Sequence, residues 1–315
     1  MTNMTPELLQ KIEQSGAVVE LSDRTKLMLR GADRVRYLNG QVTNDVRKAS
    51  AGSSAIHACV TNAKGRIEGD VFIHAPPDSD TLCLDAEGVL RESLRVRLDR
   101  YIVADDVELV DISDGPRLWH FFGQAVNAVG QMPVTGASYF VPATRFGVPG
   151  VDLWLSQGMD LPRFDCPQLA REDLETFRII HGIPRWPKEL NGDVFPQEAG
   201  LETSAMDFSK GCYIGQEVLS RIKTTGKMPR VMVKWEMPPQ SKIPVEHLSP
   251  ARLFSRGADD QLKEIGQVTS ACMHPLLDRG VGLGYVRQSF EAVHSLLIAH
   301  ADESTIAHEV KIIRI

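Results

Sequence analysis

The strongest chemical signal in this sequence is a cysteine placed between two glycines just before a predicted helix. The residues concerned are Lys210, Gly211, Cys212, Tyr213, Gly215, Gln216, Glu217 and Arg221. Val218, Leu219 and Ile222 recur at helical spacing, so we expect a helix to begin after Gly215. The free N–H groups and the dipole at a helix N-terminus favour negative charge. With Lys210 nearby, this position would favour a reactive thiolate at Cys212.

A second interpretation of the same residues needs no chemistry. A lone cysteine in a turn is commonly a small buried apolar group. Glycines at 211 and 215 would then simply allow the turn. In the chemical interpretation, Gln216 and Glu217 would fix the hydrogen bonds of the cysteine turn. Exposure of the sulfur atom separates the two interpretations.

The string Lys-Gly-Cys-Tyr-x-Gly-Gln-Glu, with Arg221 four residues beyond Glu217, resembles the signature of the YgfZ family. A second stretch, Leu-Asn-Gly-Gln-Val-Thr-Asn-Asp-Val at 38–46, resembles the same family more weakly. That family is the folate-binding branch of the glycine-cleavage T-protein superfamily and is linked to iron–sulfur cluster assembly or repair. The resemblance implies tetrahydrofolate or a derivative as cofactor, and iron–sulfur client proteins or their assembly machinery as partners.

Composition is that of an ordinary globular protein. The chain has 315 residues, 43% hydrophobic and 24% charged, with a net charge of −6, which argues against a nucleic-acid coat or a membrane-surface protein. No apolar run is long enough to cross a bilayer and no signal peptide is visible, so we expect no membrane contact. Five scattered cysteines without a CxxC pair predict a reducing cytoplasm, no disulfide framework and no metal site.

The pattern of strands and helices predicts an α+β fold. Apolar runs at 17–21 and 26–30 resemble a hairpin of paired strands, and apolar spacing predicts helices over 87–101 and 167–181. In the helix at 87–101, Leu90, Leu94, Leu98 and Tyr101 would form the buried face. Hairpins mixed with helices favour two-layer subdomains over a run of parallel strand–helix–strand units. The family resemblance implies that these subdomains surround a central folate pocket.

The chain changes character after Met237. Prolines make 238–250 a linker between a body at 1–237 and short strand-like runs at 251–315, which predict a small C-terminal β-barrel. The glycine-rich runs 266–270 and 282–286 resemble the barrel of the T-protein superfamily.

The resemblance also points to folate-contacting residues, with two departures. Where the T-protein enzymes hold the pterin with a Glu, this chain has Ile180, and where they place paired Asp residues it has Gly69 and Asp70. Asn62, at the preceding turn, is a further candidate. These departures put aminomethyl transfer in doubt and leave open whether the chain is an enzyme. For Asp70, simple solvation at a hairpin edge is the structural alternative.

Upstream of the cysteine, Gln197 and Glu198 form a polar pair that would contact the folate. Arg178 would either meet a ligand carboxylate or anchor Glu198 in a structural salt bridge, since a guanidinium serves both uses.

A basic run could take a different ligand. It consists of Lys210, Arg221, Lys223, Lys227 and Arg230. It would suit a folate glutamyl tail or a weak contact with tRNA phosphate, although most of these charges fit a solvated face.

The main functional prediction is a folate-dependent accessory factor for iron–sulfur proteins, with Cys212 as the reactive thiol tuned by Lys210. Two alternatives stay open. One is a folate-dependent aminomethyl- or methyltransferase, and the other is an accessory scaffold in tRNA modification.

Overall fold

The chain divides into two compact units in the computed structural model. It describes residues 4–49, 52–77, 79–129, 138–159, 164, 166–239, 248–256, 261–290, 295–300 and 308–314. The two-sheet unit comprises Gln10–Ala170 and Leu201–Ser220. The barrel unit comprises Met1–Leu9, Arg171–Gly200 and Arg221–Ile315. Helix α1 (Pro6–Ser15) crosses from one unit to the other.

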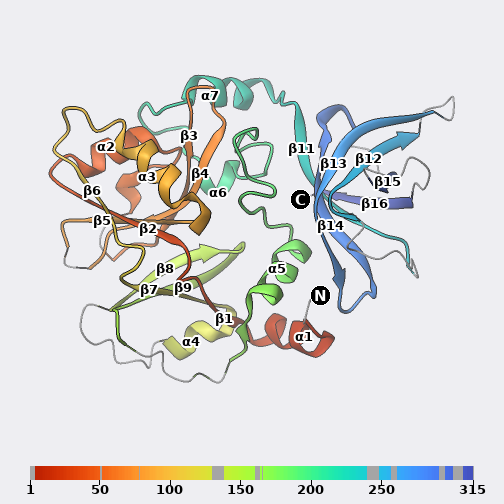
Figure 1. Cartoon of the computed structure of the whole chain (residues 1–315), viewed down its shortest axis with the longest axis horizontal. Coiled ribbons are helices and arrows are strands. Elements are labelled where there is room, and N and C mark those ends of the chain that lie inside the picture. Colours follow the sequence, from red (N-terminus) through yellow and green to blue (C-terminus); the bar gives the residue numbers. More distant parts are fainter. Residues whose placement is uncertain are drawn as a thin grey trace. The chain divides into compact units, whose positions relative to one another are not determined.

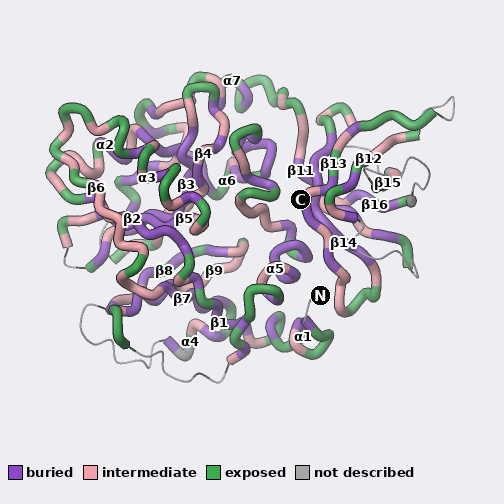
Figure 2. The backbone as a smooth tube through the Cα atoms, viewed as in Figure 1, coloured by how far each residue is buried: buried purple, intermediate pink, exposed green. Residues whose placement is uncertain are grey.

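The two-sheet unit holds two five-stranded sheets (Figure 1). The first has the order β3-β4-β5-β2-β6, with β2 (Thr25–Arg30), β3 (Ile56–Thr61), β4 (Ile67–His74), β5 (Leu82–Ala86) and β6 (Glu108–Asp111). The second has the order β10-β1-β7-β9-β8, with β1 (Ala17–Glu20), β7 (Arg117–Phe122), β8 (Tyr139–Arg145), β9 (Val148–Leu155) and β10 (Gln168–Leu169). Most of the buried residues of this unit lie on these strands (Figure 2).

The predicted hairpin of 17–21 with 26–30 is wrong. Strand β1 pairs with β7 and β10 in the second sheet, whereas β2 pairs with β5 and β6 in the first. The short connection therefore carries the chain from one sheet to the other. The alternation of apolar residues identified both strands correctly, but it contains no information about their partners.

Short helices accompany the two sheets. They are α2 (Arg34–Gln41), α3 (Arg91–Asp99), α4 (Val126–Val129) and α6 (Glu202–Ala205), with 3-10 turns η1 (Val46–Lys48), η2 (Gly88–Leu90) and η3 (Gly123–Ala125). In η2 and α3, Leu90, Leu94 and Leu98 are buried as predicted. Tyr101 lies beyond the end of α3 and is 39% exposed, so its predicted place on the buried face is wrong.

The barrel unit contains a closed barrel of six strands in the order β11-β14-β13-β12-β15-β16. They are β11 (Arg230–Glu236), β12 (Ala251–Arg256), β13 (Leu262–His274), β14 (Arg279–Arg287), β15 (Ser295–His300) and β16 (His308–Arg314), with the 3-10 turn η5 (Gln288–Phe290) after β14. The predicted C-terminal barrel is confirmed. It begins earlier than expected, because β11 precedes the proline-rich linker, of which residues 240–247 lie outside the described residues.

Close packing fixes the barrel interior. Trp235 is fully buried, and its indole N–H donates to the Leu283 carbonyl oxygen over 3.2 Å. A Cβ at Gly282 would lie 2.3 Å from the Trp235 ring, which explains a glycine at this position. Helix α5 (Arg171–Ile180) packs against β13 and β14 in the same unit. It is shorter than the predicted helix at 167–181, and Gly182 follows it with a φ of 75°.

Candidate functional site

Cys212 is exposed. It lies in the irregular segment between α6 and α7 (Gln216–Thr225), whereas Cys59, Cys83 and Cys272 are buried. Cys166 has intermediate exposure. Helix α7 begins at Gln216, directly after Gly215, as predicted. The sulfur of Cys212 is therefore placed at the surface just before a helix, which excludes the interpretation as a buried apolar group.

The two stretches that resemble the YgfZ family lie side by side in the two-sheet unit. We call residues 38–46 the upstream segment and residues 205–216 the cysteine segment. The Ile214 N–H donates to the Gly40 carbonyl over 3.1 Å. The Asp207 N–H donates to the Thr43 carbonyl over 3.0 Å. The Thr43 hydroxyl donates to the Ala205 carbonyl over 2.6 Å. The cysteine segment is thus fixed along its length by the upstream segment.

Lys210 is the central link between these segments. Its side chain is buried, and Nζ donates to the carbonyl oxygens of Asn39, Val42 and Asn44 over 2.6, 2.6 and 2.8 Å. These carbonyls lie at and just beyond the end of α2, where a positive charge also interacts favourably with the helix dipole. An ammonium group has three N–H donors, and here all three are used. Lys210 therefore holds the backbone with all three donors, and its predicted tuning of the Cys212 thiol stays a prediction.

The environment of Lys210 shifts its pKa. Burial lowers the pKa to about 8, although the carboxylates of Asp45 and Asp207 act in the opposite direction. Nζ also lies 5.0 Å from the centre of the Tyr213 ring. Tyr213 is buried, burial raises its pKa to about 12, and its hydroxyl has no hydrogen-bond partner among the described residues. An unsatisfied buried hydroxyl directly after the cysteine is a position where a ligand could bond.

The two glycines of the motif differ in what they do. Gly215 has a φ of 90°, and a Cβ there would lie 2.6 Å from the Asn62 carbonyl oxygen. Gly215 therefore allows the cysteine segment to approach the β3–β4 turn closely. A Cβ at Gly211 would meet no atom within 4 Å among the described residues. The predicted need for glycine at 211 has no steric basis here.

The side chains of Gln216 and Glu217, at the start of α7, do not form the predicted hydrogen bonds with the cysteine segment. Glu217 is exposed, and Gln216 donates its backbone N–H to the Tyr213 carbonyl over 3.2 Å. Within the described part of the chain, neither side chain bonds to the cysteine segment. The expectation that Gln216 and Glu217 fix this turn by side-chain hydrogen bonds is therefore corrected. Arg221 is exposed on the same helix.

Asn62 and Asp70 lie at different places on the β3–β4 hairpin. The Asn62 side-chain oxygen accepts the N–H groups of Lys64 and Arg66 over 2.9 and 3.1 Å, which stabilises the turn. Asp70, on β4, forms a hydrogen-bonded pair with His57 on β3. The oxygen of Asn62 is thus used locally, whereas the Asp70 carboxylate is held by an imidazole.

Arg178 is a structural residue of the barrel unit. Its guanidinium is 2% exposed and bonds Glu175, Glu189, Ser270 and the Ile183 carbonyl. These contacts use its five N–H donors, so none is left for a ligand. The prediction that Arg178 meets a folate carboxylate or anchors Glu198 is replaced by this buried network.

Gln197 and Glu198 are both buried, as suits a polar pair with a fixed orientation. One Glu198 carboxylate oxygen accepts the Phe195 N–H over 2.9 Å and lies 3.4 Å from the Arg230 guanidinium. Arg230 also donates to the Asp193 carbonyl. Because Lys210 and Arg230 are engaged in this way, the predicted basic run is reduced to Arg221, Lys223 and Lys227, all exposed.

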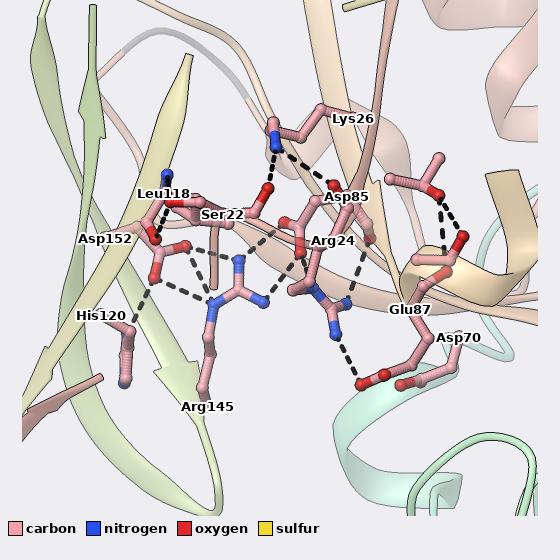
Figure 3. Close-up of polar contacts among 12 residues, drawn as sticks. Ser22, Arg24, Lys26, Asp70, Asp85, Glu87, Leu118, His120, Arg145 and Asp152 are labelled. Atoms are coloured by element: carbon pink, nitrogen blue, oxygen red, sulfur yellow. Dashed lines mark hydrogen bonds and ion pairs between the residues drawn. The ribbon is translucent and has the colours of Figure 1, made fainter. Parts of the chain in front are cut away.

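A buried charge network was missed by the sequence analysis. The Arg145 guanidinium bonds both carboxylate oxygens of Asp85 and both of Asp152, at distances of 2.7 to 3.1 Å (Figure 3). His120 Nδ1 lies 2.7 Å from Asp152, and Arg24 bonds Asp85. Burial by itself raises the pKa of each carboxyl, but Arg145, together with Arg24 at Asp85 and His120 at Asp152, outweighs it and both pKa values are lowered. The network joins β5 of one sheet to β8 and β9 of the other. The presence of charged residues within otherwise apolar strands was the sequence feature that could have indicated this network.

Among the described residues, no three His, Cys, Asp or Glu side chains gather closely enough to bind a metal ion. None of the helices in the described ranges is long and apolar enough to span a membrane.

The fold is similar to that of a solved protein. The structure superposes on glycine cleavage system aminomethyltransferase T from Bartonella henselae with a TM-score of 0.79, covering 99% of this chain and 90% of that one at 16% identity. The chain therefore has the aminomethyltransferase T fold, with mixed helices and strands and a closed C-terminal barrel. No family model matches the chain.

Sequence relatives are of two kinds. The chain is 27% identical over 235 residues to an iron-sulfur cluster assembly factor IBA57 homolog, mitochondrial, from Chaetomium globosum, over 66% of this chain and 53% of that protein. It is 25% identical over 318 residues to an aminomethyltransferase from Shouchella clausii, over 91% of this chain and 82% of that protein. The chain thus spans about half the length of the IBA57 relative. These similarities support a place in the T-protein superfamily.

Proposed function

We propose that this chain is a folate-binding accessory factor for the assembly or repair of iron–sulfur proteins, in the manner of the YgfZ family, with Cys212 as its reactive thiol. The observation that carries the proposal is the exposed cysteine in a segment that Lys210 fixes to the upstream segment. The printed name of the IBA57 relative, an iron–sulfur cluster assembly factor, supports this role. That name also says mitochondrial, and the cytoplasmic location expected from cysteine usage stays a prediction.

The geometry suits a thiol that meets a large partner. Its backbone is held by the hydrogen bonds of Ile214, Asp207 and Lys210, so little conformational freedom is lost on binding. The exposed sulfur precedes the N-terminus of α7, where negative charge is favoured. A thiolate there would attack a substrate or ligate an iron atom of the cargo briefly. The proposal includes both forms of chemistry.

The residues present fit a folate in part. The unsatisfied hydroxyl of Tyr213 and the half-buried Asp70 in the two-sheet unit are polar groups able to bond a pterin edge. The ligand role of Gln197 and Glu198, which belong to the barrel unit, stays a separate prediction. Arg178 is left out because its donors are used, and Asn62 because its oxygen closes a turn. Bound tetrahydrofolate would supply a carrier for one-carbon units.

Complementation tests the proposal. Cells that lack this protein would be supplied with the wild-type chain, the Cys212→Ala variant or the Cys166→Ala variant, and the activity of their iron–sulfur enzymes would be measured. We expect Cys212→Ala to lose most of the restored activity while Cys166→Ala keeps it, with both proteins folded by circular dichroism. Full activity of Cys212→Ala would contradict the proposal.

A folate-dependent aminomethyltransferase is the second candidate, favoured by the aminomethyltransferase relative that aligns over 91% of this chain. Ile180 and Gly69, at the positions of the expected carboxylates, argue against it. Turnover of an aminomethyl donor with tetrahydrofolate that survives Cys212→Ala would favour the transferase. The tRNA scaffold rests on the few exposed cations of α7 and stays a prediction.

A further inference from the structure

The β3–β4 hairpin carries an imidazole–carboxylate pair that the proposed function does not yet use. His57 Nε2 and a carboxylate oxygen of Asp70 form a hydrogen bond between the neighbouring strands. Their side chains are 15% and 16% exposed, so the pair is neither a surface contact nor a fully buried one. Such a position, screened from bulk water but still accessible, is typical of residues that contact a ligand.

The imidazole of His57 is held in place by Phe72. Its ring stacks on Phe72, with ring centres 4.6 Å apart and planes within 5° of parallel. The Arg145 guanidinium also lies over Phe72, 4.1 Å from its centre. Phe72 therefore contacts both the His57 ring and the Arg145 guanidinium. Asp85 and Asp152 fix Arg145 in turn (Figure 3). A chain of buried contacts therefore orients the partly exposed ring.

These contacts leave one edge of the imidazole for a ligand. Asp70 holds Nε2, and Phe72 covers one face of the ring. Nδ1 of His57 has no hydrogen-bond partner among the described residues. A carboxylate that accepts from Nε2–H fixes the tautomer, so Nδ1 of the neutral ring carries a lone pair and accepts a hydrogen bond.

The charges beside this edge select the kind of ligand. The Asp70 carboxylate disfavours an anionic group next to it. Arg145 is bound to both carboxylates of the buried network, which neutralise its charge. A neutral, flat ring with an N–H donor satisfies both the lone pair and the exposed part of the imidazole.

We propose that His57 contacts the pterin ring of a reduced folate by accepting an N–H hydrogen bond at Nδ1, and that Asp70 is the positioning residue that holds the ring. This inference rests on the proposed folate binding. It replaces direct ligand contact by Asp70 with contact through His57.

The test is the affinity for 5-formyltetrahydrofolate, a stable reduced folate, measured by titration calorimetry. His57→Gln keeps an amide near the Nε2 position and loses the Nδ1 acceptor, so we expect at least about tenfold weaker binding. Asp70→Asn removes the charge that orients the ring and should weaken binding by about three- to tenfold. Lys64→Ala, at an exposed residue of the same hairpin, is the matched control and should bind as the wild type does.

A third variant separates a ligand contact from a merely structural role. His57→Asn places its amide near the Nδ1 position, so it can still accept the ligand N–H, but its side chain is too short to reach Asp70 as Nε2 does. We expect His57→Asn to bind the probe at least about threefold more tightly than His57→Gln. A merely structural role predicts the reverse, because only the longer Gln side chain reaches Asp70.

Two results overturn the inference in distinguishable ways. If His57→Gln and Asp70→Asn, both folded by circular dichroism, bind the probe as tightly as the wild type, or if His57→Asn binds it no more tightly than His57→Gln, the inference fails and folate binding stands. If the wild-type protein does not bind the probe at all, the inference and the folate part of the proposed function fail together.

Discussion

Lys210 Nζ lies 2.6 Å from the Val42 carbonyl oxygen, and this contact joins residues that are 168 positions apart in the sequence. With the bonds to Asn39 and Asn44, it fixes the cysteine segment to the end of α2. The position of the Cys212 sulfur therefore depends on a buried lysine.

Replacing Lys210 by Met should destabilise the protein. Methionine fills similar space but leaves three buried carbonyl groups without their donor. We expect the free energy of unfolding to fall by about 2–4 kcal/mol, as measured by urea titration. Lys227→Met removes an exposed lysine just after α7 and should change stability by less than about 0.5 kcal/mol. If the two substitutions lowered the free energy of unfolding equally, Lys210 would not stabilise the contact between the two segments.

The lowered pKa of Lys210 gives a pH dependence with a defined sign. Burial lowers the pKa from 10.5 to about 8 in the folded chain, so the unfolded chain binds more protons between these values. Stability contributed by Lys210 should therefore rise with pH across this window and stay constant below it. We expect the stability difference between wild type and Lys210→Met to grow by about 1 kcal/mol from about pH 7 to about pH 9. A difference that shrinks over this range would show that the pKa is not lowered.

The two glycines of the cysteine segment should respond differently to alanine. Gly215→Ala forces a positive φ and places Cβ against the Asn62 carbonyl, so we expect a loss of at least about 2 kcal/mol in unfolding free energy. Gly211→Ala has open space around its Cβ and should change stability by less than about 1 kcal/mol. Thermal denaturation of the two variants side by side tests this. A greater loss in Gly211→Ala would be the contrary result.

Arg145→Met should leave two buried carboxylates without their main positive partner. Asp85 and Asp152 would lose the guanidinium that compensates their burial, at a cost of about 3–5 kcal/mol near neutral pH. Without Arg145, burial raises the pKa of both carboxyls, so the folded variant takes up protons more readily than the unfolded chain. The variant should therefore recover part of its lost stability relative to wild type as the pH falls to about 5. Urea titrations at the two pH values measure this, and a loss that grows in acid would contradict it.

Local sequence patterns predicted most of the helices and strands and the cysteine motif, but they did not predict which strands pair. Gln216 begins α7 and the barrel strands follow their apolar runs, because these features depend on neighbouring residues. The separation of β1 from β2 and the inclusion of β11 in the barrel depend on distant strands.

In the candidate site too, local features could be predicted from the sequence, whereas contacts between distant residues could not. The motif marked Lys210 as important, but its acceptors lie in the upstream segment, and nothing in the sequence paired the two segments. His57 carried no motif, and its pairing with Asp70 follows from the register of β3 and β4. Asp85 and Asp152 lie in apolar strands, and only the packing of these strands brings them to Arg145. The sequence alone therefore did not predict this contact.

The most direct test of the account uses the native sequence with Cys212 blocked chemically. Brief treatment with iodoacetamide should alkylate Cys212 before the buried Cys59, Cys83 and Cys272, as followed by peptide mass spectrometry. Purified protein would then be added to an extract of cells that lack it, and the recovery of iron–sulfur enzyme activity would be measured. The account predicts that recovery falls in proportion to the alkylated fraction of Cys212. Full recovery with Cys212 completely alkylated would contradict it.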